Sequence, residues 1–182
     1  MLLKRGFTLV EMLFVVIIAA TALALALPSY KSMRERGKFQ AASGMLIDLG
    51  GAVESITRDL AMQGESASNV NVGSSYIEVN NENMAFTPTD TQTVKQMFDG
   101  LSGTASAKVL KLLVPAGYLK NFVGQAGFKY YVGGGTGSKC GGDNVVACMI
   151  KPNPDSKDCF AGARYYKGGR FETIRMANCK NN

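Results

Sequence analysis

The sequence predicts an α+β fold, in which a long N-terminal α-helix packs on a C-terminal antiparallel β-sheet domain. Apolar residues recur at helical spacing through the first third of the chain, and short β-prone runs bounded by glycine and proline replace this pattern beyond residue 127. All four cysteines lie after residue 139, which predicts a C-terminal region closed by disulfides. The 182 residues leave room for one modest domain beyond the helix.

The first helical segment is long and apolar. No charged residue occurs from Met12 to Leu27, and Thr21 is the only polar one. A helix over Phe7 to Leu27 would be about 31 Å long, which is enough to cross a bilayer. Lys4 and Arg5 precede this segment, and the positive-inside rule places their end in the cytoplasm and the bulk of the chain outside.

Glu11 interrupts the start of the apolar segment. An ionisable group inside a membrane span is costly and usually has a dedicated partner. The basic pair ends at Gly6, before the apolar core, whereas a secretory signal peptide has its small-residue cleavage site after the core. The pattern therefore argues against a secretory signal peptide, and an ordinary signal anchor would leave Glu11 without a role.

A family resemblance rests on the run Lys4-Arg5-Gly6-Phe7-Thr8-Leu9-Val10-Glu11, which is similar to the class III leader of type IV prepilins and pseudopilins. The run Leu27-Pro28-Ser29-Tyr30 resembles the helix-melting proline of this family with a tyrosine shortly after it, whereas Ala20 stands where many members have glycine. The resemblance implies that a membrane peptidase cuts between Gly6 and Phe7 and that the new N-terminal Phe7 is methylated.

The resemblance also implies a domain layout and a role for Glu11. Residues 1–6 would be the cleaved leader, 7–28 the transmembrane and filament-core helix, 29–63 its amphipathic second half and 64–182 the globular head. In a bundle of such helices, Glu11 could pair with the Phe7 amine of a neighbouring subunit. This pairing would offset two desolvation costs and set the axial register of the subunits.

The second half of the helix carries one apolar stripe, whose members recur at three- and four-residue steps: Ala42, Met45, Leu46, Leu49, Val53, Ile56 and Leu60. Pro28 removes one helical hydrogen bond, which predicts a kink or a looser helix at that point. Gly64 is the expected stop. Glycines within the helix lower helix propensity by about 1 kcal/mol each and indicate close packing of the globular part: Gly37, Gly44, Gly50 and Gly51.

The globular head is expected to begin with a polar loop over residues 64–75 and a short strand over Tyr76–Val79. Two short helices are expected over Val94–Leu101 and Ala105–Val114. Lys167-Gly168-Gly169-Arg170 is typical of a hairpin turn between the last two strands. Four β-prone runs complete the sheet: Phe128–Val132, Val145–Ile150, Phe160–Tyr166 and Phe171–Met176.

Four clustered cysteines in an exported region imply two disulfides. Three connectivities remain open, and we favour Cys140–Cys148 with Cys159–Cys179. The second pair closes the longer loop, and by the chain-entropy model this disulfide would stabilise the fold by about 3 kcal/mol. A zinc site is the competing interpretation, but the spacings contain no Cys-x-x-Cys pair and the chain has no histidine.

The positive charge is concentrated at the C-terminus. Residues 7–150 are balanced, with eleven basic and eleven acidic side chains, within a chain of formal charge +6. Seven basic residues follow against three acidic ones: Lys151, Lys157, Arg164, Lys167, Arg170, Arg175 and Lys180. A basic face of this kind could attract DNA or another surface polyanion. The plainer interpretation is a solvated edge or a contact with an acidic face of the next subunit.

Nothing in the sequence indicates an enzyme. Histidine, the commonest general base and metal ligand, is absent. The glycine run Gly133–Lys139 lacks the adjacent Gly-Lys of a phosphate-binding loop. Asp155 and Asp158 beside Asn153 supply too few oxygens for calcium. We expect no catalytic residue, no cofactor and no metal.

Taken with the resemblance, these features predict a structural subunit of a type IV pilus filament that serves adhesion, motility or DNA uptake. Its partners would be identical or related pilin subunits, a prepilin peptidase/methyltransferase and the inner-membrane assembly machinery. Before assembly it would cross the inner membrane once, with the C-terminal domain in the periplasm. The alternatives are a pseudopilin of a type II secretion system, or a minor pilin whose basic C-terminal region binds DNA or a surface.

Overall fold

The structure is a computed structural model that describes residues 8–87, 92–120, 122–134, 140–142, 144–152 and 160–175. The chain divides into two compact units, Met1–Phe39 and Gln40–Asn182, and their boundary falls inside the long helix. For seven of these residues the structure describes the backbone alone: Ala26, Pro28, Ser29, Ser32, Phe160, Ala161 and Arg175.

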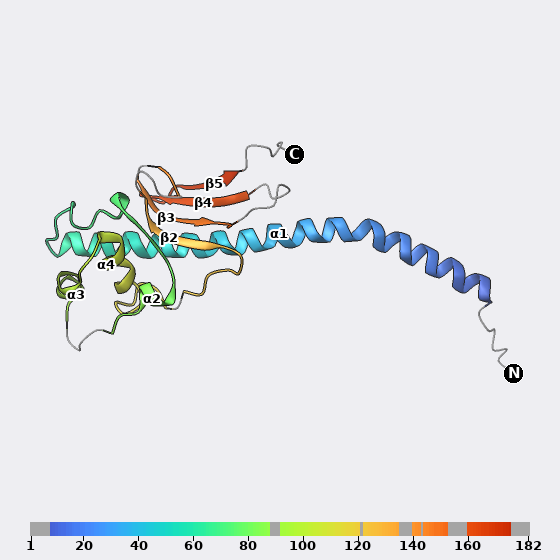
Figure 1. The fold of residues 1–182 in the computed structure, drawn as a ribbon, viewed down its shortest axis with the longest axis horizontal. Coiled ribbons are helices and arrows are strands. Elements are labelled where there is room, and N and C mark those ends of the chain that lie inside the picture. Colours follow the sequence, from blue (N-terminus) through green and yellow to red (C-terminus); the bar gives the residue numbers. More distant parts are fainter. Residues whose placement is uncertain are drawn as a thin grey trace. The chain divides into compact units, whose positions relative to one another are not determined.

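Helix α1 runs from Leu9 to Met62 (Figure 1), so it ends one residue before the predicted boundary at residue 63 and two before the predicted stop at Gly64. The helix continues through Pro28, so this residue does not end it, which agrees with the loss of a single backbone hydrogen bond. Among the described residues, no helix combines the length and the apolar character needed to cross a bilayer.

The globular unit contains a five-stranded antiparallel sheet in the order β1-β2-β3-β4-β5. Each strand overlaps one of the five predicted β-prone runs, so the α+β class and the antiparallel sheet are confirmed. The strands are β1 (Tyr76–Glu78), β2 (Lys129–Gly133), β3 (Val145–Ile150), β4 (Phe160–Tyr166) and β5 (Phe171–Arg175).

The turn predicted between the last two strands is present. Gly168 and Gly169 have φ of +88° and +86°, the left-handed values that a tight hairpin turn requires. The Tyr166 amide donates to the Arg170 carbonyl at 2.8 Å and closes the hairpin.

Four short helices lie between β1 and β2 or just before β1, and only two of them were predicted. The predicted ones are α3 (Val94–Gly100) and α4 (Ala105–Leu112), which begin at the N-caps Thr93 and Thr104. The others are a 3-10 turn, η1 (Val72–Ser74), within the predicted polar loop, and α2 (Asn81–Met84). Both are shorter than two helical turns and show no apolar periodicity, which is why the sequence did not indicate them.

The stripe of α1 forms the core of the globular unit. Six of the seven predicted stripe residues are buried, and the seventh, Met45, is partly buried. One face of the sheet meets this helix, because the Tyr130 hydroxyl donates to the Ala42 carbonyl at 3.3 Å and the Tyr165 ring lies against Gly50. A Cβ at Gly50 would lie 2.8 Å from Tyr165 Cε1 and closer still to the ring carbons nearer the backbone.

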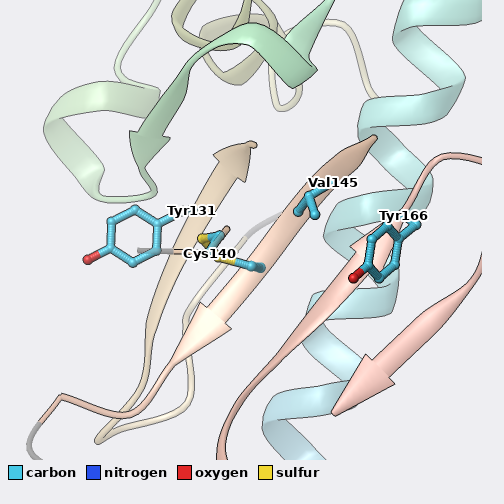
Figure 2. Packing of buried hydrophobic residues seen from close by; sticks show 5 residues of the cluster. Tyr131, Cys140, Val145 and Tyr166 are labelled. Atoms are coloured by element: carbon cyan, nitrogen blue, oxygen red, sulfur yellow. A yellow bond between two sulfur atoms is a disulfide. The ribbon is translucent and has the colours of Figure 1, made fainter. Parts of the chain in front are cut away.

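The other face of the sheet carries a second cluster. Tyr131 follows Tyr130 in β2 and therefore points away from α1. It lies opposite Cys148 in the register of β2 and β3. The cluster consists of Tyr131, Cys140, Val145, Cys148 and Tyr166, and Figure 2 shows four of these side chains with labels over the strands.

Candidate functional site

The first turn of α1 is closed by a capping box between Thr8 and Glu11. The Glu11 carboxylate oxygen Oε2 accepts hydrogen bonds from the Thr8 amide and the Thr8 hydroxyl, both at 3.0 Å, and the Glu11 amide donates to Thr8 Oγ1 at 3.3 Å. In the single subunit Glu11 thus bonds to groups of its own chain. Its predicted partner, the amine of Phe7, lies outside the described residues, as does the predicted cleavage position at Gly6.

Beyond this cap, α1 exposes a nearly continuous apolar surface. The exposed fraction is 84% for Leu9 and still 77% for Leu25. The only polar side chain in this stretch, Thr21, bonds to carbonyls of its own helix, those of Ile17 and Ile18, at 3.1 and 2.9 Å. The exposed apolar side chains are those of Leu9, Val10, Met12, Leu13, Phe14, Val15, Val16, Ile17, Ile18, Leu23, Leu25 and Leu27.

A group of cations follows the apolar surface on the same helix. Lys31, Arg34 and Arg36 are exposed, and Lys38 forms an ion pair with Glu35 at 2.9 Å. These residues were not among the site residues predicted from the sequence. The signal that would have revealed them is local: the balanced charge of residues 7–150 hides four cations within the eight residues 31–38, a span that begins four positions after Leu27.

The structure joins Cys140 and Cys148 in a disulfide with Cα atoms 6.0 Å apart, as the favoured connectivity predicts. Both cysteines are fully buried. The Arg164 Nε donates to the Cys140 carbonyl, and because Arg164 lies opposite Cys148 in the register of β3 and β4, this contact is on the face of the sheet away from α1. The disulfide therefore holds the connection between β2 and β3 across that face. Cys159 and Cys179 lie outside the described residues.

The predicted basic C-terminal face is only partly available. Arg164 is tied to the Cys140 carbonyl, and the Arg170 guanidinium lies 4.0 Å from the centre of the Tyr166 ring. Lys167 is exposed. Lys157 and Lys180 lie outside the described residues, as do Asp155 and Asp158, the weak calcium candidates. The described cations thus include two that serve contacts of their own chain, which argues against an unobstructed basic surface.

A second charged cluster ties α3 to the chain that follows α1. Lys95 Nζ contacts the carboxylates of Glu65 and Asp99, the latter at 3.1 Å. The hydrogen bond from Lys95 lowers the pKa of Glu65, with a smaller effect from Asn69, and the bond to Glu65 raises the pKa of Lys95. The described residues contain no group of three metal-ligating side chains that could hold a metal ion.

Tyr118 and Asp59 make a further contact with α1 that the sequence did not indicate. The Tyr118 hydroxyl donates to Asp59 Oδ2. Burial, together with this bond to a carboxylate, raises the pKa of Tyr118 to about 12. These polar contacts join parts of the chain that lie far apart in the sequence. Four tyrosines of the sheet are buried, which leaves their rings unavailable for stacking on an external ligand: Tyr130, Tyr131, Tyr165 and Tyr166.

Compared with known proteins, the chain matches no family model, no curated protein and no solved structure.

Proposed function

We propose that the protein is a structural subunit of a type IV pilus-like filament, assembled through the first half of α1. The observation that carries the proposal is the exposed apolar surface from Leu9 to Leu27. Monomeric soluble proteins rarely expose apolar patches of such extent, and larger ones mark protein or membrane contacts. Lipid before assembly and neighbouring copies of the same helix after assembly would cover this surface.

The membrane stage of the proposal concerns the segment from Phe7 to Leu27. This segment includes Phe7 and the side chain of Ala26, which the structure does not describe. In the proposed state the subunit crosses the inner membrane once, with Gln40–Asn182 outside the cytoplasm. Thr21 satisfies its own hydroxyl within the helix, which leaves Glu11 as the one charged side chain of the described segment that the bilayer would enclose.

Glu11 has two alternative partners in this proposal. In the single subunit it caps α1 through Thr8. In the filament, Glu11 would accept a hydrogen bond from the Phe7 amine of a neighbouring subunit. This amine forms when the leader is cleaved after Gly6. On assembly, Glu11 would exchange its bonds to Thr8 for a bond to the Phe7 amine of the neighbouring subunit. Only a subunit at the correct axial position could complete this pair.

Glu11→Gln tests the proposal. The variant should still insert and lose its leader, because neither step uses the Glu11 charge, whereas removal of one partner of a buried pair costs about 3–5 kcal/mol on assembly. The matched control is Glu82→Gln, at an exposed position on α2. Filament yield by electron microscopy of sheared cells should collapse for Glu11→Gln alone. A wild-type yield from this variant would refute the assembly role of Glu11.

A further inference from the structure

We infer that the cations that follow the apolar surface bind the headgroups of anionic phospholipids on the side of the membrane that faces the globular domain. We call the exposed cations Lys31, Arg34 and Arg36 the basic collar. The inference rests on the proposed function, because it takes the apolar segment of α1 to lie in a bilayer. It adds a partner that the proposal does not name, a lipid of defined charge.

The position of the basic collar along α1 matches the headgroup layer. The apolar surface from Leu9 to Leu27 extends over about 27 Å of helix, close to the thickness of a hydrocarbon core. Lys31 follows Leu27 by about 6 Å and Arg34 by about 10 Å, whereas the headgroup layer on each side is about 5–8 Å thick. Long basic side chains can also reach back to phosphates while their stems lie along apolar surface. Lys31 therefore falls at phosphate depth, and Arg34, which lies just beyond the layer, can reach it with its long side chain.

The arrangement of the collar around α1 favours lipid over a partner that approaches from one side. At about 100° per residue, Lys31 and Arg34 lie about 60° apart around the helix axis, and Arg36 lies about 140° from Lys31. A polyanion such as DNA would contact one face only. Lipid headgroups surround a membrane helix on every side and can therefore neutralise all three cations at once.

The collar is also available for binding. Lys31, Arg34 and Arg36 are exposed, and no ion pair with any of them occurs among the described residues. Lys38 is partly buried and paired with Glu35. Three unpaired cations therefore carry the proposed contact, and Lys38 is left out of the test.

The test measures lipid selectivity of the full-length chain in nanodiscs that contain equal amounts of phosphatidylcholine and phosphatidylglycerol. Native mass spectrometry of the released protein counts the lipids of each kind that remain bound. Each cation near an anionic surface strengthens binding about fivefold, so the preference for phosphatidylglycerol should fall about a hundredfold in the triple variant K31Q/R34Q/R36Q. The preference of the wild type should also weaken as salt rises.

A matched control separates the collar from general charge. The variant R58Q/K120Q/K167Q removes the same number of positive charges at three exposed positions of the globular unit, and it should keep the wild-type preference. Equal loss in both variants, or no loss in the collar variant, would overturn the inference. A collar variant that assembles poorly while its preference for phosphatidylglycerol is unchanged would assign the collar to a contact between subunits and would also overturn it.

The proposed function fails in a different way. A chain that does not enter nanodiscs of phosphatidylcholine alone would contradict the membrane stage, and with it the inference. A chain that enters them but shows no preference for phosphatidylglycerol would contradict the inference alone and leave the filament proposal standing.

Discussion

Gly50→Ala should destabilise the globular unit, although alanine is the better helix former. Gly50 is buried where α1 meets the sheet, and an added Cβ would lie 2.8 Å from Tyr165 Cε1 and closer to Cγ and Cδ1. Those two atoms are at the base of the ring, so rotation of a flexible end cannot relieve the contact. Either β4 must move away from α1 or Tyr165 must leave its rotamer.

The size of the effect follows from two opposing contributions. Overpacking of a core site costs about 1–3 kcal/mol, and a clash with the base of a ring belongs at the upper end. Replacement of glycine by alanine within a helix returns about 0.5–1 kcal/mol. We therefore expect Gly50→Ala to lower the free energy of unfolding by about 2 kcal/mol, which corresponds to a fall in Tm of about 4–8 °C.

Other glycines of α1 supply the control. A Cβ at Gly44 or Gly51 would meet nothing within 4 Å, so alanine there should raise stability by about 0.5–1 kcal/mol. Chemical denaturation of the full-length chain in detergent, followed by near-ultraviolet circular dichroism, measures all three variants. In a Tyr165→Ala background the penalty of Gly50→Ala should disappear. A Gly50→Ala chain as stable as Gly51→Ala would refute this account of how the helix meets the sheet.

Three further predictions concern the polar contacts and the disulfide. Because Lys95 lowers the pKa of Glu65, their contact should stabilise the fold above the ordinary carboxyl pKa, and this stability should be lost as pH falls below it. In a plot of unfolding midpoint against pH, Glu65→Gln should flatten the fall at acid pH. Because the pKa of Tyr118 is raised to about 12, the stability of the fold should fall as pH rises from about 10 to about 12. Tyr118→Phe should remove this pH dependence. At neutral pH the same variant should lose about 1 kcal/mol of stability, because it lacks the bond to Asp59. Cys140→Ser should lower stability by about 2 kcal/mol in thermal unfolding, since it opens a loop that spans eight sequence positions.

Each of these has a contrary result. If the unfolding midpoint of Glu65→Gln still falls at acid pH as in the wild type, other carboxylates cause that fall. An alkaline slope unchanged in Tyr118→Phe would exclude that hydroxyl as its source. A Cys140→Ser chain with wild-type Tm would mean that burial, and not the covalent bond, holds the connection between β2 and β3 in place.

Much of the fold could be predicted because its long elements carry strong periodic signals. The α1 stripe and the run Val145–Ile150 agree with the structure to within a residue or two. The short elements η1 and α2 could not be found, since three or four residues hold no period. The four helix glycines were predicted to mark close packing of the globular part, and this was right at Gly50; an added Cβ at Gly37, Gly44 or Gly51 would meet nothing within 4 Å, so no packing contact requires glycine there.

The difference among these glycines follows from the angular position of each one around the helix, which the sequence gives. Gly50 lies beside the apolar stripe, four residues after Leu46 and three before Val53, whereas Gly51 lies on the opposite side of the helix. Contacts between distant segments had no such signal. The bond from Tyr118 to Asp59 joins residues 59 positions apart, and no local pattern marks either partner.

The central claim is that this chain is processed at its N-terminus and then assembled through α1. Intact-mass analysis of protein recovered from sheared filaments tests it most directly. We expect the mass of residues 7–182 with one added methyl group, the mass of a chain that begins at a methylated Phe7. A mass that retains residues 1–6 would contradict the proposed processing and, with it, the filament subunit proposed here.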